Sequence, residues 1–415
     1  MVDPLPPLPG PPRLEVARDL TERQKQWGIG LKDAVARGEH FAICSSDEFE
    51  EIFHLLGIHP LVVNYWHSLV VATGNARHYT QLLADRGYDM VGMGPLGYAA
   101  AIDPSLAPWG GLPKPLIMLG STRDEGEFLF MELWAKEFGC PYYPLDFNLT
   151  GPYRRPPPDG WWNQLRSNWE TLVDPHQLDL RVAEVQALIG HLEQVIGRTF
   201  PQDALCDVLD RINLQMDLWT EGLELLADAP LCPVTLRDQL AMYQAMWHRG
   251  TQQGIDYARR FRDEVGERVE AGIGAYHEEK YRLLFWSGDH EPRFHRYLQH
   301  QHGAVFVGNV YSGTPGFYAR DYDPREPLRA LCSRNLFLIA HETPQWMIGI
   351  AQRLRCDAVI ARERSFPRNP RDAQLCEEAG IPYLNVPHLA DDAKIRDMLD
   401  RFIEEKVAPN KAAKG

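Results

Sequence analysis

The sequence predicts an α/β protein with two doubly wound parallel sheets joined by a helical segment. Short apolar runs of strand length recur toward both ends of the chain, and segments with helical spacing separate them. Strands that alternate with helices form parallel sheets through right-handed crossovers. A chain of 415 residues also exceeds the size at which one hydrophobic core keeps growing, so more than one domain is expected.

The N-terminal α/β domain is predicted over residues 38–150. Segments with helical spacing, such as HYTQLLADRG and FLFMELWAKEFG, separate its strands. Residues 1–37 are expected to form a proline-rich arm and a first helix, because MVDPLPPLPGPP contains six prolines. The five expected strands are HFAICS (40–45), PLVVNYW (60–66), YDMVGMG (88–94), PLIMLG (115–120) and PYYPLDF (141–147).

Residues 151–280 are expected to form a linker and a helical region. The linker GPYRRPPPDGWW is rich in proline, which interrupts regular structure. In VAEVQALIGHLEQVIG after it, apolar residues recur at intervals of three and four and form one stripe on a helix. The same spacing continues through ALCDVLDRINLQMDLWTEGLELL, so the middle of the chain is predicted to be helical.

The strand pattern returns in a C-terminal α/β domain, predicted over residues 281–407. Its expected strands are YRLLFWSG, AVFVGNVYSG, NLFLIAHE, CDAVIARE and IPYLNVPH. Two α/β domains joined by helices leave a cleft between them, and small-molecule sites usually lie at such domain interfaces. Residues 408–415, APNKAAKG, are expected to be a disordered tail.

Charge and cysteine usage argue against several classes of protein. The formal net charge of −14 disfavours binding to nucleic acid, which needs a basic face. No apolar run approaches the roughly 18 residues of a membrane span. The seven cysteines are scattered singly, which favours a cytoplasmic protein without disulfides. The spacing of His290, His295, His300 and His302 does not match a helical zinc site, so no metal site is predicted.

The order of these elements resembles the 2-hydroxyacyl-CoA dehydratase and benzoyl-CoA reductase family, as a divergent dehydratase D-component subunit. The phrases that carry the resemblance are HLEQVIGRTF, RINLQMDLW, EEKYRLLFWSG, CDAVIARERSF and GIPYLNVPH. It implies a subunit of a two-subunit enzyme that binds an acyl-CoA between two flavodoxin- or Rossmann-like domains. It further implies a 4Fe-4S cluster, held by cysteines, that passes an electron from a separate ATP-driven protein to the thioester.

The sequence departs from this family where the cluster ligands belong. The resemblance places ligand cysteines near Gly97 and Tyr98, near Arg123 and Asp124, and near Ser365, and none of these positions holds a cysteine. Cluster iron is bound by thiolates, which arginine and glycine cannot replace. We therefore expect no cofactor on this chain beyond a CoA thioester as ligand, with a 4Fe-4S cluster in a partner subunit.

Candidate site residues are those that follow the predicted strands, where parallel sheets bind ligands. A carboxylate or histidine beside a thioester could act as a general base, and arginine or tyrosine could stabilise an enolate oxygen. The candidate catalytic residues are Glu125, His67 and Asp289. The candidate substrate-binding residues are Trp66, Tyr98, Arg123, Asp124, His290, Tyr311, Ser312, Arg364 and Ser365.

Structural roles compete with these functional ones. Asp124 and Glu125 open a predicted helix, where acidic residues suit the helix dipole whatever the function. Arg123 could equally be a salt-bridge partner. Trp66 is a candidate for core packing, and His67 for an ordinary polar contact.

The sequence thus favours a cluster-less subunit of a heteromeric dehydratase or benzoyl-CoA reductase-like complex that acts on an aromatic or 2-hydroxy acyl-CoA. Such a chain would shape the acyl-CoA pocket or the interface with a related subunit, and the resemblance implies a setting in anaerobic breakdown of aromatic acids. Two alternatives stay open: a stand-alone acyl-CoA lyase or hydratase that uses acid-base residues, and a noncatalytic assembly or scaffold protein.

Overall fold

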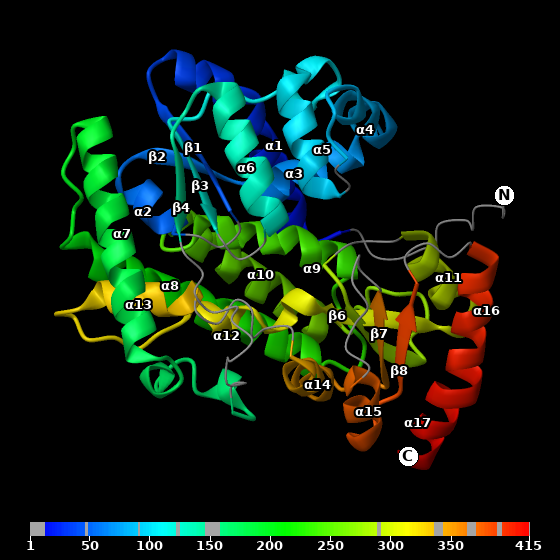
Figure 1. Ribbon diagram of the computed structural model, residues 1–415. Coiled ribbons are helices and arrows are strands. Elements are labelled where there is room, and N and C mark those ends of the chain that lie inside the picture. The colour runs from blue at the N-terminus through cyan, green and yellow to red at the C-terminus, as the bar shows by residue number, and fades with distance from the viewer. Residues whose placement is uncertain are drawn as a thin grey trace.

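The computed structural model describes residues 13–45, 49–89, 92–121, 125–145, 158–288, 292–335, 343–362, 371–387 and 392–414. Over these residues the chain forms two four-stranded sheets, each of them parallel throughout, with helices around and between them (Figure 1). This confirms the predicted α/β class with two parallel sheets. We call residues 13–145 the N-terminal lobe, 158–278 the helical middle and 281–414 the C-terminal lobe.

The N-terminal lobe contains the first sheet, with strand order β2-β1-β3-β4. Its strands are β1 (His40–Cys44), β2 (Ile58–Val62), β3 (Ile117–Ser121) and β4 (Tyr142–Leu145). Its helices are α1 (Glu15–Ala36), α2 (Glu50–Leu55), α3 (Val63–Ala72), α4 (Ala76–Asp85), α5 (Met93–Ile102) and α6 (Glu125–Phe138).

The helical middle follows the predicted amphipathic pattern. Its helices are α7 (Pro175–Ile196), α8 (Ala204–Asp228), α9 (Leu236–Met242) and α10 (Gln252–Glu270), with a 3₁₀ turn, η5 (Tyr243–His248), before α10. Side-chain caps set the helix starts, since Asp174, Thr235 and Thr251 accept hydrogen bonds from the first free backbone N–H groups of α7, α9 and α10. In Figure 1, α8 and α10 run between the two sheets.

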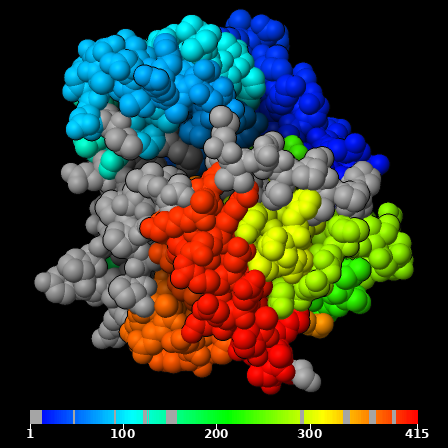
Figure 2. All heavy atoms as spheres, turned by 90° about the vertical axis from the view of Figure 1, so that its right-hand side faces the viewer, coloured from blue at the N-terminus to red at the C-terminus, as the bar shows by residue number. Residues whose placement is uncertain are grey.

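The C-terminal lobe repeats the topology of the first, with strand order β6-β5-β7-β8. Its strands are β5 (Tyr281–Trp286), β6 (Ala304–Asn309), β7 (Ala358–Arg362) and β8 (Tyr383–Val386). A 3₁₀ turn, η6 (Val310–Gly313), follows β6. Its helices are α11 (Pro292–His302), α12 (Pro315–Tyr318), α13 (Pro327–Asn335), α14 (Pro344–Arg353), α15 (Arg371–Glu378), α16 (Asp392–Phe402) and α17 (Ala408–Lys414). Figure 2 shows this lobe below the blue and cyan N-terminal lobe.

Both sheets are buried on two faces, which explains why their strands read as continuous apolar runs. Side chains alternate along each strand. In β1, Ala42 and Cys44 pack into a core shared with the helical middle, while Phe41 and Ile43 pack into a second core on the other face. Strand β5 alternates in the same way between the shared core and a third core. One central core therefore connects both lobes to the helical middle.

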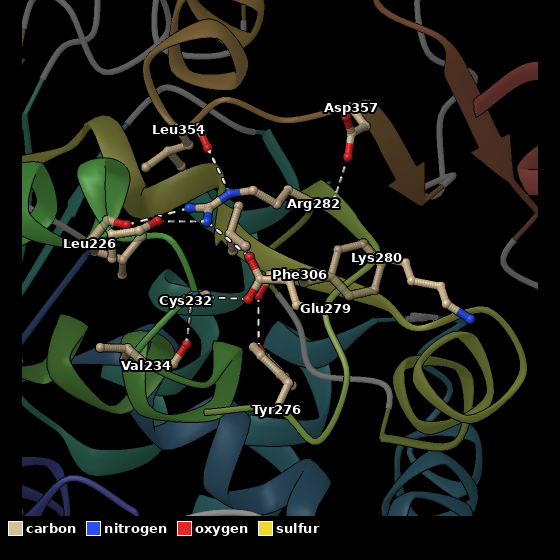
Figure 3. A network of polar contacts seen from close by, with 12 residues as sticks. Leu226, Cys232, Val234, Tyr276, Glu279, Lys280, Arg282, Phe306, Leu354 and Asp357 are labelled. Carbon is tan, nitrogen blue, oxygen red and sulfur yellow. Dashed lines mark hydrogen bonds and ion pairs between the residues drawn. The ribbon is translucent and has the colours of Figure 1, made fainter. Parts of the chain in front are cut away.

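A partly buried arginine, Arg282, connects the helical middle to the second sheet (Figure 3). Arg282, at the start of β5, donates hydrogen bonds to the carbonyl oxygens of Leu226 (3.4 Å) and Ala229 (3.2 Å) at the end of α8. It also donates to the carbonyl oxygen of Leu354 (3.3 Å) and to a carboxylate oxygen of Glu279 (2.9 Å). The last carbonyls of a helix have no partner within it, so Arg282 satisfies acceptors that would otherwise be unpaired.

Three expectations about these elements need correction. Residues 60–66 were expected to form a strand, but β2 ends at Val62 and α3 begins at Val63. Residues 88–94 were expected to form a strand, but Tyr88 and Asp89 lie outside any strand, and α5 begins at Met93. The tail predicted to be disordered forms α17 instead. It is held because Lys411 donates to the carbonyl oxygen of Lys280 (2.7 Å) and pairs with Asp357 (2.9 Å).

Residues 1–12, most of NLFLIAHE (336–342) and most of the Pro-rich linker (151–157) lie outside the described residues. Among the helices that the structure describes, none is both long and apolar enough to cross a lipid bilayer.

Candidate functional site

The carboxyl ends of the two sheets are the expected place for a ligand. In a sheet of order 2-1-3-4 the chain reverses its winding direction between the first and third strands, and open α/β sheets bind ligands at this switch point. These points lie between β1 and β3 in the N-terminal lobe and between β5 and β7 in the C-terminal lobe. Residues that follow the strands of both sheets contact η5 of the helical middle, as the contacts below show.

Several predicted site residues lie outside the residues that the structure describes. They are Arg123, Asp124, Asp289, His290, Arg364 and Ser365, all in segments that follow strands β3, β5 and β7. Glu125 begins α6, but its side chain is outside the described set. The roles assigned to these residues stay predictions.

Trp66 and His67 follow β2 on α3 and are enclosed by protein. The indole nitrogen of Trp66 donates a hydrogen bond to the carbonyl oxygen of Gly97 (2.9 Å). The His67 side chain is 2% exposed, and its ring centroid lies 5.4 Å from that of Phe130 and 6.4 Å from that of Trp134. Burial lowers the pKa of His67 to about 3, so the imidazole is neutral near pH 7.

Gly97 packs directly against this histidine. A Cβ atom at Gly97 would lie 2.1 Å from Cδ2 of His67, closer than any side chain permits. Tyr98, the next residue on α5, is 2% exposed and lies edge-to-face with Tyr88 at 6.3 Å. Burial and the neighbouring Tyr88 raise the pKa of Tyr98 to about 12. Trp66 and His67 thus pack against Gly97, and Tyr98 belongs to the same hydrophobic core as Trp66.

Tyr311 and Ser312 lie together in η6, directly after β6. The backbone N–H of Asn309 donates to the hydroxyl of Ser312 (2.9 Å), and the backbone N–H of Tyr311 donates to the side-chain oxygen of Asn309 (2.7 Å). This reciprocal capping box fixes the turn. The Ser312 hydroxyl also lies 3.4 Å from the side-chain oxygen of Gln239 on α9. The described candidates therefore fall into two groups, one in each lobe.

A buried cluster of ion pairs, which the sequence did not predict, joins all three parts of the chain. Glu50 and Glu51 open α2 after β1, Arg249 follows η5, and Arg334 lies on α13. One carboxylate oxygen of Glu51 accepts hydrogen bonds from Arg249 (2.9 Å) and Arg334 (2.8 Å), and Glu50 pairs with Arg249. The Arg249 guanidinium also lies over the ring of Tyr318, 4.4 Å from its centroid. All four charged side chains are at most 3% exposed.

Electrostatics keep Glu51 ionised within this cluster. Burial alone would raise the pKa of Glu51, but the guanidiniums of Arg334 and Arg249 lower it by more, so that it lies well below its usual value. The second carboxylate oxygen of Glu51 has no hydrogen-bond partner among the described residues. An ionised carboxylate of this kind accepts hydrogen bonds and is a poor general base.

Part of this cluster had a signal in the sequence. The acidic run SDEFEE directly follows the first predicted strand, HFAICS, so the sequence places it after the carboxyl end of that strand. Arg249 and Arg334 carry no comparable signal, because each is separated from Glu51 by about 200 residues or more and only the tertiary fold brings them together.

Comparisons with known proteins agree with this architecture. A family model described as 2-hydroxyglutaryl-CoA dehydratase, D-component, matches residues 49–404. The (R)-phenyllactyl-CoA dehydratase alpha subunit of Clostridium sporogenes is 23% identical over 274 residues, which make up 65% of this chain. The matched region spans 61% of that relative's own length. As the sequence phrases predicted, the chain belongs to the 2-hydroxyglutaryl-CoA dehydratase D-component family.

Proposed function

We propose that this chain is a cluster-less subunit of a heteromeric dehydratase or benzoyl-CoA reductase-like complex, and that it shapes the pocket for an acyl-CoA thioester. Family membership supports a dehydratase component. The observation that carries the cluster-less role is the contact between Gly97 and His67. The family resemblance places a ligand cysteine near Gly97. The imidazole of His67 occupies the space that a cysteine side chain at position 97 would need.

The cysteines of the chain fit an iron-sulfur cluster poorly. Cluster iron is bound by thiolates. Burial raises the pKa of Cys232, Cys332 and Cys376 to about 12, which keeps these thiols protonated. Among the described residues, no three histidine, cysteine or carboxylate side chains lie close enough together to hold a metal ion. If a cluster supplies one-electron chemistry to this complex, a cysteine-bearing partner subunit is the better candidate to hold it.

The named relative supports the heteromeric setting and the substrate class. It is described as the alpha subunit of a dehydratase whose substrate is (R)-phenyllactyl-CoA, a 2-hydroxy acyl thioester with an aromatic ring. We propose a substrate of the same chemical class for this chain and a related subunit as its partner.

Metal analysis of the isolated chain tests the cluster-less role. The chain is purified without oxygen, and iron and acid-labile sulfide are measured per polypeptide. A family subunit that keeps its ligand cysteines, purified in parallel, is the control. We expect a colourless protein with far less than one iron per chain, whereas a brown protein with stoichiometric iron and sulfide would end the proposal.

The acid-base alternative, in which the chain alone is a lyase or hydratase, assigns catalysis to Glu125, His67 or Asp289. Of these, His67 is enclosed by aromatic side chains, and the side chains of Glu125 and Asp289 lie outside the described residues. Under the proposed function we expect no turnover of acyl-CoA esters by the isolated chain. Turnover that is insensitive to oxygen and is lost in Glu125→Gln or His67→Ala would favour the alternative.

A further inference from the structure

A row of four aromatic side chains runs between corresponding edges of the two sheets. Tyr311, directly after β6, stacks on Tyr243 of η5 with ring centroids 4.0 Å apart and an interplanar angle of 25°. Trp247, near the other end of η5, lies edge-to-face with Tyr243 at 6.4 Å. Tyr65, in the first turn of α3 after β2, packs on Trp247 at 4.8 Å. We call Tyr311, Tyr243, Trp247 and Tyr65 the aromatic row.

Three of the four residues in this row remain partly exposed to water. Tyr243, Trp247 and Tyr311 are half-buried, whereas Tyr65 is 9% exposed. Covering such a ring removes apolar surface from water. A second aromatic ring covers it best, because offset-stacked and edge-to-face contacts add to the gain from burial alone.

The backbone beneath the row is held in place. The capping box of Asn309 and Ser312 fixes the turn that carries Tyr311. Gly288, two residues after the switch-point strand β5, lies against the outer part of the Tyr311 side chain, and a Cβ atom there would be 2.4 Å from the phenol oxygen. Gln239 ties α9, which leads into η5, to β6 by donating to the carbonyl oxygen of Val307 (2.9 Å). A surface organised before binding loses little conformational entropy when a ligand arrives.

We propose that Tyr311, Tyr243 and Trp247 form the binding surface for the acyl part of the thioester, and that this surface selects planar aromatic acyl groups over saturated ones. The inference rests on the proposed function, since it takes an acyl-CoA as the ligand. The aromatic row connects the carboxyl ends of the edge strands β2 and β6, which neighbour the switch-point strands β1 and β5, and Gly288 after β5 contacts Tyr311. Its uncharged rings suit an acyl group, and the charged phosphates of coenzyme A require other contacts.

Two thioesters of matched size separate aromatic recognition from plain apolar burial. Phenylacetyl-CoA and cyclohexylacetyl-CoA have the same carbon skeleton, but only the first has a planar aromatic ring. A merely apolar surface would bind the more hydrophobic cyclohexyl ester at least as tightly. Aromatic recognition reverses that order, and we expect the full chain to bind phenylacetyl-CoA about fivefold to tenfold more tightly in calorimetry.

Substitutions in the row then localise the selectivity. In Tyr311→Leu and Trp247→Leu the preference should fall to within about twofold, whereas Tyr311→Phe keeps the ring and should keep the preference. Trp27→Leu is the matched control, because Trp27 is a half-buried aromatic residue on α1 whose ring lies 6.5 Å from that of His59, at the amino-terminal part of β2. The Trp27→Leu variant should prefer phenylacetyl-CoA over cyclohexylacetyl-CoA as strongly as the unmodified chain does. Thermal unfolding checks that each variant is folded.

The outcomes distinguish the inference from the function on which it rests. Equal affinity for both esters in the unmodified chain, or an unchanged preference in both leucine variants, would overturn the aromatic surface while leaving acyl-CoA binding in place. Failure to bind either ester would overturn the proposed function together with the inference.

Discussion

The two lobes share one strand order, yet they use the same topological position differently. Edge strand β2 runs directly into α3, which buries His67 against Gly97. The corresponding strand β6 runs into a capped 3₁₀ turn that leaves Tyr311 half-buried over Gly288. In the N-terminal lobe the segment after the edge strand buries its histidine. In the C-terminal lobe the corresponding segment leaves an aromatic ring partly exposed to solvent. Shared topology therefore tells where a site can form, and the local side chains decide whether it does.

Removing the ion pairs that join the lobes should have the largest effect on stability. Arg249→Met leaves two buried carboxylates with fewer opposing charges, and breaking a buried pair in this way costs about 3 to 5 kcal/mol. Unfolding in urea, followed by circular dichroism, measures the loss. Arg355→Met is the matched control, because its pair with Asp228 is exposed and should contribute less than about 1 kcal/mol. Equal losses in the two variants would show that the buried ion pairs stabilise the fold no more than an exposed pair does.

Because His67 is buried, we expect the stability of the fold to depend on pH through this residue. The corresponding segment after β6 contains no buried histidine. Burial lowers the pKa of His67 to about 3 from an ordinary value of 6.5, so the unfolded state takes up a proton at a higher pH than the folded state. The stability that this histidine contributes is complete above its ordinary pKa and declines as the pH falls toward 3. Between pH 7 and pH 5 the decline due to His67 alone is about 2 kcal/mol.

His67→Leu should reduce the loss of stability between these two pH values by that amount. Part of the decline remains, because burial also lowers the pKa of His248, to about 4. His176→Leu, at an exposed position near the start of α7, is the control and should leave the decline unchanged. An unaltered pH dependence in His67→Leu would mean that this imidazole is not as enclosed as its contacts indicate.

Two glycine substitutions test the same difference in packing. Gly97→Ala places a methyl group against the enclosed ring of His67, and overpacking of this kind should cost about 1 to 2 kcal/mol. Gly288→Ala places a methyl group against the phenol oxygen of Tyr311, but this half-buried ring has more room to shift than the enclosed His67, so the cost should be smaller, about 0.5 to 1 kcal/mol. Thermal unfolding compares the two. A larger loss of stability in Gly288→Ala than in Gly97→Ala would contradict the view that His67 is enclosed and Tyr311 is accessible.

The smallest expected effect concerns the turn beneath Tyr311. Ser312→Ala removes one half of the capping box, which should cost about 1 kcal/mol or less. Ser312→Ala should affect ligand selectivity more than stability, because the turn no longer holds Tyr311 in a fixed position. We expect the preference for phenylacetyl-CoA to weaken while Ser312→Thr, which keeps a hydroxyl, retains it. Unchanged selectivity in Ser312→Ala would separate the turn from ligand recognition.

Much of the fold could be predicted from the sequence because its signals are local. Runs such as HFAICS and YRLLFWSG are buried on both faces and read as strands without knowledge of their partners. The tail of the chain was misjudged because its helix is held by long-range contacts, such as that of Lys411 with Asp357. Local composition cannot report a contact of that kind.

The candidate site was only partly predictable for the same reason. Tyr311 and Ser312 were found because they directly follow a strand. Tyr243 and Trp247 were missed because they lie in a helical region, where aromatic residues usually indicate core packing. Arg249 was missed because a buried ion pair between lobes leaves no spacing pattern in the sequence.

Hydrogen exchange with bound ligand tests most directly whether the carboxyl edges of the two sheets form the acyl-CoA site. The chain is labelled in deuterated buffer with and without saturating phenylacetyl-CoA, and exchange is followed by mass spectrometry of peptides. We predict slower exchange in residues 239–249 and 304–314, and no change around Arg282, whose hydrogen bonds are satisfied within the protein (Figure 3). Protection confined to surfaces away from these two segments, with the ligand demonstrably bound, would contradict the account.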